Sequence, residues 1–318
     1  MGRGGSDLGT AARYIGGRAL QGLVVVFGAV VISFALTSLI GNPADVLRGS
    51  GFTTPESLAT LKDALGYDVP APERFARYVE RLLHGDFGAS YRTGESAAGL
   101  VMAALPYTLM LVGGAMLLAS LVAFPAALLS VLRRDSTADR TVRRSLIVAQ
   151  GVPEFWLALV LMLVFAVWLQ VLPTVGYRGL ESAVLPTIAL AVPFTSTLLR
   201  LVRAQLLDVM DLDFVTTLRA KGLSDARIVM THGLHNALPQ VVTFLALQTG
   251  YLISGTIVIE AVFGWPGMGS LLLEAVSARD VVVVQAVVIF VGLCFVALNL
   301  AADLLVMALD PRIRTGRR

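Results

Sequence analysis

Six long apolar runs dominate the sequence and constrain its fold more than any other feature. They cover approximately residues 19–40, 107–132, 146–171, 184–207, 241–262 and 282–307. Each is long enough to cross roughly 30 Å of hydrocarbon at about 1.5 Å per helical residue. Only 15% of the 318 residues are charged, whereas soluble domains carry about 25%. The sequence therefore predicts an all-α integral membrane protein with six transmembrane helices.

Two of the runs need separate consideration. The first follows Arg13 and Arg18 in the manner of a signal peptide, but its length and the lack of a convincing small-residue cleavage site indicate a span. The fourth is the weakest, because Pro186 and Pro193 are expected to break it. Prolines are tolerated inside a membrane where neighbouring groups satisfy the freed carbonyls, so both runs are retained as spans.

Basic residues between the runs define the orientation. Sixteen lie at the N-terminus, in the segment RRDSTADRTVRR, around residues 203–227 and in the C-terminal tail, and eight lie in the other loops. Six of those eight belong to one long loop, where the positive-inside rule carries little weight. The rule predicts that both termini are cytoplasmic. We interpret the arginines as topology signals, so no nucleic-acid partner is expected.

This topology divides the chain into four parts. Residues 1–41 hold a cytoplasmic segment and the first span, and residues 42–100 form an extracytoplasmic helical loop. Residues 101–310 hold the core with the other five spans, and residues 311–318 form a basic cytoplasmic tail.

The extracytoplasmic loop is expected to contain two helices. Thr54-Pro55 begins the first and Gly66 ends it, whereas the second begins near Pro72 and closes at His84-Gly85. Apolar residues of the second helix share one face: Phe75, Tyr78, Val79, Leu82 and Leu83. Two interpretations stay open, a cap packed on the membrane ends or a landing surface for an external partner.

No catalytic motif is apparent. The two lysines, Lys62 and Lys221, do not fit the phosphate-binding G-x-x-x-x-G-K-[ST] loop, and H-E-x-x-H does not occur. Cys294 is the only cysteine, which excludes a disulfide within the chain, and the three histidines do not predict a buried metal trio. We therefore expect no catalytic residue and no metal site.

Acidic residues within the spans are few. Glu154 follows Pro153 early in the third run and is a candidate for lining a pathway, whereas Asp303 lies near the cytoplasmic end of the sixth. Proton-coupled carriers usually need buried acidic or histidine relays. A stand-alone carrier or channel is therefore a weaker hypothesis than a transporter that is powered by another protein. A membrane scaffold without transport is also weaker, because it would not explain the polar segment at residues 216–239.

The segment TTLRAKGLSDARIVMTHGLHNALP is polar and basic and lies between two apolar runs. Asp213 is expected to cap a helix from Phe214 to Lys221, Gly222 to adopt a left-handed conformation, and Ser224 to cap a second helix from Asp225 to about Asn236. Apolar side chains are interspersed among the charges: Leu218, Leu223 and Ile228. The segment suits either a rigid protein contact or an amphipathic helix lying on lipid.

The same segment carries a resemblance to a known family. RAKGL (219–223) and HGLHNALP resemble the EAA loop of permease subunits of bacterial ATP-binding-cassette (ABC) importers, in particular the dipeptide, oligopeptide and nickel branch. Leu218 in place of the usual alanine and the early Pro239 are mild departures. Three further segments are similar to the family's patterns, in the expected order: GDFGASYRTGES (85–96), GTIVIEAVFGWPGMGSLLLEAVSARD (255–280) and LDPRIR (309–314).

The resemblance implies a type I ABC importer permease fold in the bacterial cytoplasmic membrane and a division of labour among subunits. This chain would pair with a second homologous permease, two ATPase subunits would use ATP and Mg, and an extracytoplasmic solute-binding protein would deliver di- or oligopeptides. The chain itself would be no enzyme and would hold no cofactor. The same branch handles nickel chelates, glutathione and opine-like compounds, so the solute stays open.

The resemblance also implies roles for residues. In the cytoplasmic coupling loop 208–239, the contact with the ATPase would comprise Leu218, Arg219, Ala220, Lys221, Gly222, Leu223, Ser224, Asp225 and Arg227. The external gate, or the dock for the binding protein, would comprise Glu260, Phe263, Trp265, Pro266, Gly267 and Gly269. Residues 263–270 are expected to form a tight outer turn with Trp265 at interfacial depth, where a simple membrane anchor is the alternative.

Overall fold

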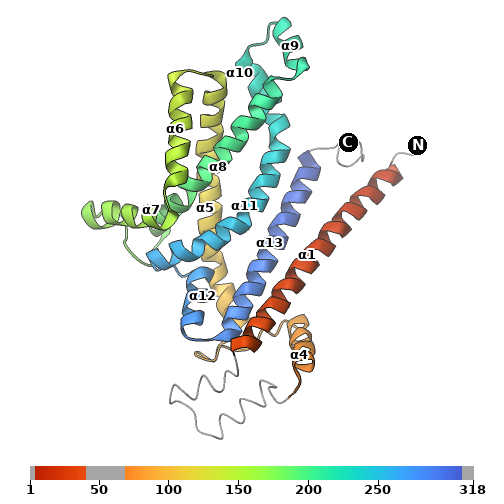
Figure 1. The fold of residues 1–318 in the computed structure, drawn as a ribbon, viewed down its shortest axis with the longest axis vertical. Coiled ribbons are helices and arrows are strands. Elements are labelled where there is room, and N and C mark those ends of the chain that lie inside the picture. The colour runs from red at the N-terminus through yellow and green to blue at the C-terminus, as the bar shows by residue number, and fades with distance from the viewer. Residues whose placement is uncertain (1–3, 41–68, 310–318) are drawn as a thin grey trace.

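The computed structural model describes residues 4–40 and 69–309, and within these ranges every regular element is a helix. Five long helices form the body of the molecule (Figure 1): α1 (Gly4–Ile40), α5 (Ala97–Leu132), α8 (Val184–Met210), α11 (Leu234–Phe263) and α13 (Val281–Leu309). Among the described residues, five stretches are long and apolar enough to cross a membrane, and a bent helix pair makes a possible sixth. The predicted class, an all-α membrane protein, is confirmed.

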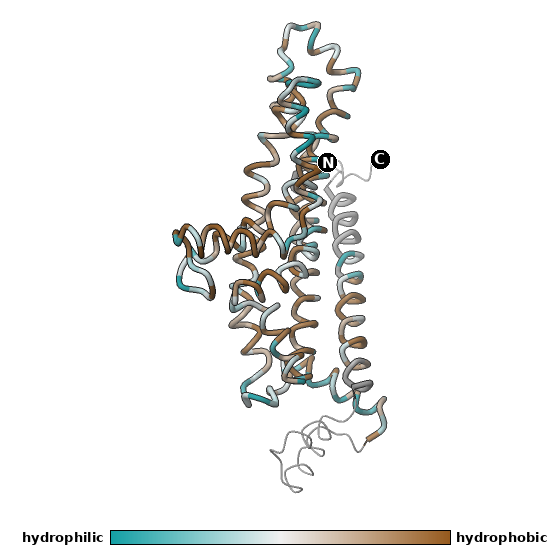
Figure 2. The backbone as a smooth tube through the Cα atoms, turned by 60° about the vertical axis from the view of Figure 1, so that its left-hand side comes forward, coloured by the Kyte–Doolittle hydropathy of each residue, from teal (hydrophilic) through white to brown (hydrophobic). Residues whose placement is uncertain are grey.

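The surface of the long helices suits lipid rather than water. Hydrophobic residues follow them along most of their length (Figure 2), and large apolar side chains point outwards, with Leu117 and Leu121 of α5 62% and 63% exposed. Exposing such surface to water costs about 25 cal/mol per Å². The same side chains in hydrocarbon incur no such cost, which explains why the bundle can carry large apolar side chains on its outside.

The third predicted span, 146–171, is wrong as a single helix. The structure divides it into α6 (Thr137–Gly151) and α7 (Glu154–Leu161), and α7 continues as a π-helical stretch over Met162–Trp168. The two parts meet at an angle of 97°, and α7 projects sideways from the bundle (Figure 1). Pro153 explains the break, because a proline disfavours helical geometry in the residue before it, and Val152 is extended.

Two other spans differ from their predicted bounds. Helix α5 begins at Ala97, ten residues before the predicted start at 107, because Ser96 caps it by accepting a 3.4 Å hydrogen bond from the Gly99 N–H. Helix α8 runs unbroken through both of its prolines, so the predicted interruption is wrong. Pro186 lies in the first turn, where backbone N–H groups have no intrahelical partner, and Pro193 is a half-buried residue inside the helix.

Helix α8 lies at the centre of the bundle. Its span is 56% buried, against 33% for α5, α11 and α13, and it packs against α5, α6, α7 and α11. The contact with α5 uses fully buried alanines spaced four residues apart: Ala115, Ala119, Ala123 and Ala127. Small residues at this spacing lie on one helix face and let two backbones approach closely, which is the usual way that helices associate in a membrane.

Helices α1 and α13 lie side by side at one edge of the bundle (Figure 1). Near the chain termini, Arg18 Nε lies 2.9 Å from Asp303 Oδ2. This ion pair gives the one acidic residue of α13 a cationic partner on the neighbouring helix.

The described part of the loop predicted to be extracytoplasmic contains α4 (Ala71–Leu83), at the predicted place. Its face packs against α1 and α13 through a cluster of partly or fully buried residues: Val30, Phe34, Phe75, Tyr78, Val79, Leu82, Phe87 and Ile289. Leu83 is 82% exposed, so its predicted place on this face is wrong. The helix expected from Thr54 to Gly66 and the LDPRIR tail beyond Leu309 lie outside the described residues.

Candidate functional site

Two opposite ends of the molecule carry the predicted site residues. The α9 end holds α9 (Asp213–Ala220) and α10 (Asp225–Ile228). The N-terminal end of α1 and the C-terminal end of α13 lie on the same side of the molecule (Figure 1). The α12 end holds α12 (Met268–Ser277) and α4. The structure therefore keeps the predicted coupling residues and the predicted gate residues apart.

Gly222 connects α9 to α10 and adopts the predicted left-handed conformation, with φ +83°. Its N–H donates to the carbonyl of Arg219 at 2.9 Å, and the Leu223 N–H donates to the carbonyl of Leu218 at 3.2 Å. These two hydrogen bonds form a Schellman motif, which satisfies the last carbonyls of α9. Nothing lies within 4 Å of a Cβ built on Gly222, so the backbone conformation alone requires glycine there.

Three details of the predicted loop are wrong. Asp213 does not cap α9, since Leu212 occupies the cap position and Asp213 is the first helical residue. Ser224 occupies the cap position of α10, but its side chain makes no capping hydrogen bond. The second helix does not end near Asn236, because it passes through a π-helical turn at Val229–Gly233 and joins α11 as one stretch to Phe263. The loop is thus an extension of the membrane helix.

The loop has a polar exposed surface and an apolar buried layer beneath it. Of the predicted contact residues, Leu218 and Leu223 are half-buried and the others are exposed. Arg219 Nε lies 2.8 Å from Asp225 Oδ1, which joins α9 to α10. Val215, Ile228 and Val229 are fully buried beneath, so Ile228 is not the apolar surface residue predicted. The loop is a rigid polar platform on an apolar base.

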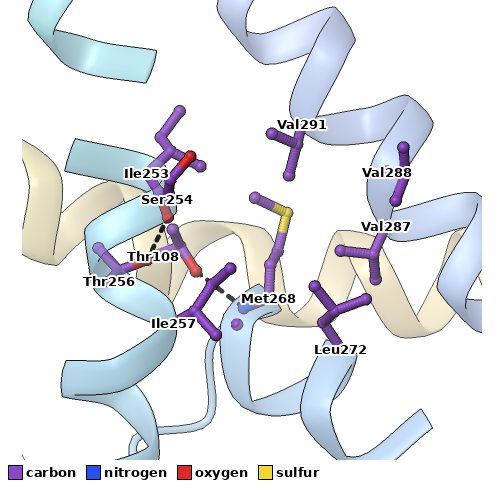
Figure 3. Close-up of a pocket in the computed structure, with 11 residues that line it drawn as sticks. Thr108, Ile253, Ser254, Thr256, Ile257, Met268, Leu272, Val287, Val288 and Val291 are labelled. Atoms are coloured by element: carbon purple, nitrogen blue, oxygen red, sulfur yellow. Dashed lines mark hydrogen bonds between the residues drawn. The ribbon is translucent and has the colours of Figure 1, made fainter. Parts of the chain in front are cut away.

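At the α12 end, Glu260 is fully buried and accepts three hydrogen bonds. The hydroxyl of Thr108 on α5 donates to Oε1 at 2.7 Å, and the N–H groups of Gly269 and Ser270 donate to Oε2 at 2.7 and 3.1 Å. The same Thr108 oxygen accepts from the Met268 N–H at 2.8 Å (Figure 3). Through these hydrogen bonds, Glu260 of α11 joins α5 and the start of α12. The dipole of α12 adds to the stability of the carboxylate, because negative charge is favoured at a helix N-terminus.

Gly267 and Gly269 make room for this arrangement. A Cβ on Gly269 would lie 2.5 Å from Ile257 Cα and 2.9 Å from Glu260 Oε2, and one on Gly267 would lie 2.3 Å from Glu260 Oε1. Both glycines are buried, whereas Pro266, which precedes Gly267 in the chain, is exposed. The W-P-G-x-G pattern is therefore required by the close approach of the carboxylate to the backbone.

Trp265 is buried inside the protein. It is 1% exposed, and its Nε1–H donates to the carbonyl of Tyr107 at 3.1 Å. Its ring makes edge contacts with Tyr177 and Tyr107 at centroid distances of 5.3 and 6.2 Å. The simple-anchor alternative is therefore wrong, because a buried ring cannot lie in lipid, whereas the predicted interfacial depth stays a prediction. The tight turn around Gly264 is present, with φ +55°. Phe263 is buried beside it.

A cavity of about 130 Å³ lies beside the Glu260 contacts, between α5, α11, α12 and α13 (Figure 3). Its walls are mostly Ile, Leu, Met and Val side chains. The hydroxyls of Ser254 and Thr256 donate to carbonyls within their own helix, at 3.1 and 2.8 Å. The cavity offers no charged group for a solute.

Glu154, the predicted pathway residue, is the first residue of α7 at the 97° bend. It is half-buried, and its Oε2 would lie 3.1 Å from a Cβ on Gly255 of α11. Within the described residues, no group of three His, Cys, Asp or Glu side chains lies close enough to hold a metal ion. Glu154 is thus a carboxylate at a helix break, against a neighbouring span.

Sequence reasoning missed two sets of residues. Tyr107 and Thr108 bind the turn between α11 and α12, but neither residue is conspicuous in an apolar run. Asp139 forms a buried cluster with Ser130 and Arg203. The available signal was Asp139 itself, since Asp135 and Asp139 are the only acidic residues in a loop otherwise rich in arginine.

Comparison with known proteins places the chain in a class. The family described as "Binding-protein-dependent transport system inner membrane component" matches residues 115–315. The chain therefore belongs to this family of permeases and is a multi-pass component of the inner membrane. The resemblance to ABC importer permeases is confirmed.

Individual relatives narrow the branch. A putative peptide transport system permease protein of Brucella abortus is 34% identical over 310 residues, covering 93% of this chain and 97% of the relative. The glutathione transport system permease protein GsiC of Salmonella paratyphi A is 34% identical over 299 residues with the same coverage. The MetNI methionine ABC transporter in an inward-facing conformation matches with a TM-score of 0.57 at 19% identity, over 66% of this chain and 96% of that chain, which shows a shared fold.

Proposed function

We propose that this chain is the permease subunit of an ATP-driven importer and that, with a second homologous permease, it forms the pathway for di- or oligopeptides. The observation that carries the proposal is the rigid polar platform at the α9 end, which is joined to α8 by a short turn after Met210 and is continuous with α11. A partner that displaces this platform displaces two spans with it. The names of the peptide and glutathione permeases support a peptide-like solute.

The platform would dock an ATPase. Its exposed residues Arg219, Lys221 and Arg227 present positive charge, and the Schellman motif at Gly222 fixes their arrangement. Two ATPase subunits would hydrolyse ATP with Mg, and the permease chain would supply no ATPase site and no cofactor. The rule that basic loops stay inside supports a cytoplasmic position for the α9 end and for both termini.

The α12 end would face the solute-binding protein. Glu260, Phe263, Trp265, Gly267 and Gly269 would hold the outer turn in one conformation, with Pro266 on its surface. These residues would support the external gate from within, because all but Pro266 are buried. Glu154 would line the pathway at the bend between α6 and α7.

Glutathione is the second candidate solute. Glutathione is itself a tripeptide, and GsiC, at 34% identity, is named for it. Nickel chelates and opine-like compounds stay open as members of the same branch. The external binding protein would make the selection among these solutes.

Gentle purification of the tagged chain from its own cells, followed by mass spectrometry, tests the assembly. We expect two ATPases and a second permease to accompany the chain, and the accompanying binding protein is then tested with dipeptides, oligopeptides, glutathione and nickel chelates. If the chain emerges alone even after mild cross-linking, the proposal is wrong.

Gly222→Val tests the coupling role. A β-branched residue is strained at φ +83°, so the connection between α9 and α10 is expected to change. Uptake should fall while the assembled complex retains ATP hydrolysis. Gly94→Val is the matched control, since Gly94 also has a positive φ (+74°) and no neighbour within 4 Å of a Cβ.

A further inference from the structure

A buried polar junction joins three helices near the α9 end. The hydroxyl of Ser130 on α5 donates to Oδ1 of Asp139 on α6, and Arg203 on α8 donates through Nε to the Ser130 oxygen at 2.7 Å. Arg203 Nη2 lies 3.3 and 3.5 Å from the two Asp139 oxygens. Ser130 and Asp139 are 0% exposed. We call these three residues the three-helix junction.

Two arginines face the Asp139 carboxylate, and they differ in exposure. The Arg203 side chain is 19% exposed, whereas Arg143, 3.3 Å from Oδ2, is 47% exposed. The N–H of Asp135 also donates to Asp139 Oδ2, at 3.2 Å. A buried charge is tolerated only when it is paired and hydrogen-bonded, and Arg203 is the more enclosed of the two partners. The junction therefore fixes the first turn of α6 to α8.

Helix α8 connects the junction to the platform at the α9 end. Leu206 lies one turn after Arg203, is 0% exposed and packs in one cluster with Val229 of the platform. A Cβ on Gly233 would lie 3.3 Å from Leu206 Cδ2, so the two segments are in close contact. After Met210, α8 leads directly into α9. One helix end thus touches the platform on one side and the α5–α6 turn on the other.

Beyond its first turn, α6 packs on the core cluster of α8 through the partly buried Val142 and Leu146, beside a cavity. A cavity of about 280 Å³ lies between α5, α6 and α8, with Ala126, Ser145 and Thr195 among its lining residues. Helix α6 then ends at the 97° bend, after which Glu154 contacts Gly255 of α11. The junction is therefore the buried polar attachment of α6 to α8, added to the apolar contacts of Val142 and Leu146.

We propose that Asp139 and Arg203 are positioning residues for energy coupling. They hold α5 and α6 to the end of α8, so that a displacement of the platform reaches the bend between α6 and α7. Without the junction, only the apolar contacts of Val142 and Leu146 join α6 to α8, and α6 follows α8 less closely. This inference rests on the proposed coupling function of the α9 end, and it assigns a transmission role to residues outside that loop.

The first test measures the distance between α6 and α8. Spin labels are placed on Arg144→Cys and Asp208→Cys, both exposed positions, after Cys294→Ala removes the native thiol. The complete transporter, with the subunits that purify with it, is compared without nucleotide and after trapping with ATP and vanadate. We expect one narrow distance in both states, and a broad or nucleotide-dependent distance in Asp139→Asn. A narrow, unchanged distance in Asp139→Asn overturns the proposal.

The second test measures ATP hydrolysis and uptake of labelled trialanine and glutathione by the same transporter in liposomes, per assembled complex. Asp139→Asn should lower the uptake-to-hydrolysis ratio about tenfold, a typical size for coupling between sites, with basal hydrolysis retained. Ser130→Ala, which strands no charge, should lower it less and is the variant of choice if Asp139→Asn does not assemble. Asp135→Asn, with an 80% exposed side chain, is the matched control and should change nothing. An unchanged ratio in both junction variants overturns the proposal.

Gly222→Val, measured in parallel, separates the two levels of inference. If Gly222→Val uncouples transport and Asp139→Asn does not, the junction proposal alone fails. If neither variant uncouples transport, the coupling role of the α9 end fails as well.

Discussion

The two ends of the molecule hold their functional residues by opposite physical means. At the α9 end, an exposed ion pair between Arg219 and Asp225 and a left-handed Gly222 shape a polar surface that water can reach. At the α12 end, the fully buried Glu260 carboxylate binds α12 to two spans. An exposed contact is weak and exchangeable, whereas a buried one is costly to break. The first suits a surface that binds partners, and the second suits a turn that must keep its shape.

The largest effect is expected from Glu260→Ala. It leaves the Thr108 hydroxyl and two backbone N–H groups without their acceptor, and each stranded buried donor costs about 1–3 kcal/mol. Thermal unfolding of the detergent-solubilised chain should shift down by roughly 5–10 °C. Glu274→Ala is the control, because Glu274 is 61% exposed and pairs with Arg92 at the surface. Equal shifts in the two variants would contradict the contrast between buried and exposed contacts.

The next largest effect separates two kinds of glycine. Gly269→Ala places a Cβ 2.5 Å from the Ile257 backbone and should cost about 1–3 kcal/mol through overpacking. Gly222→Ala meets no neighbour and should cost about 1–2 kcal/mol through φ alone. Melting temperatures give the stability order, and uptake per ATP hydrolysed should give the reverse order. The same order in both measurements would contradict the division of roles between the two ends.

A smaller effect is expected from Asp225→Asn. An exposed ion pair contributes about 0–1 kcal/mol and is screened by salt, so the melting temperature should change little and the change should vanish in about 1 M salt. Titration of ATP hydrolysis against added binding protein should nevertheless show weaker stimulation. A large loss of stability would indicate that Arg219 and Asp225 belong to the core of the loop.

The smallest effect concerns Tyr78 on α4. Burial raises the pKa of Tyr78 to about 12 from its usual 10.0, although Arg81 opposes the shift. Its hydroxyl has no hydrogen-bond partner among the residues that the structure describes, so Tyr78→Phe should change the free energy of unfolding by less than about 1 kcal/mol at neutral pH.

The pH dependence of that change follows from the raised pKa. In the unfolded chain Tyr78 ionises near pH 10, but in the folded protein it stays protonated to about pH 12. Stability should therefore fall as the pH rises from 10 to 12, and Tyr78→Phe should remove that part of the decline. Denaturant unfolding at pH 8 and pH 11 measures it. An identical decline in the wild type and in Tyr78→Phe would contradict the burial of the hydroxyl.

Local chemistry made several features predictable from the sequence alone. Apolar runs of more than twenty residues predicted a membrane protein. Gly222 after a short polar helix predicted the left-handed turn of the Schellman motif, and Pro72 with His84-Gly85 predicted the bounds of α4. Each of these depends on neighbours within a few residues. The span bounds were less predictable, because Ser96 caps α5 well before its apolar run begins.

Only the tertiary structure decided the partners of the buried charges. Glu260 meets Thr108 across 152 residues, and Arg203 meets Asp139 across 64. No local sequence pattern predicts such pairs. A single acidic residue in an apolar run has the same sequence context whether it lines a pathway or caps a helix. The 97° bend at Pro153 likewise could not be predicted from the sequence. A proline alone does not decide whether a helix breaks, since α8 continues through two prolines. The sequence determined which segments enter the membrane, and the packing of those segments decided which polar groups are satisfied inside it.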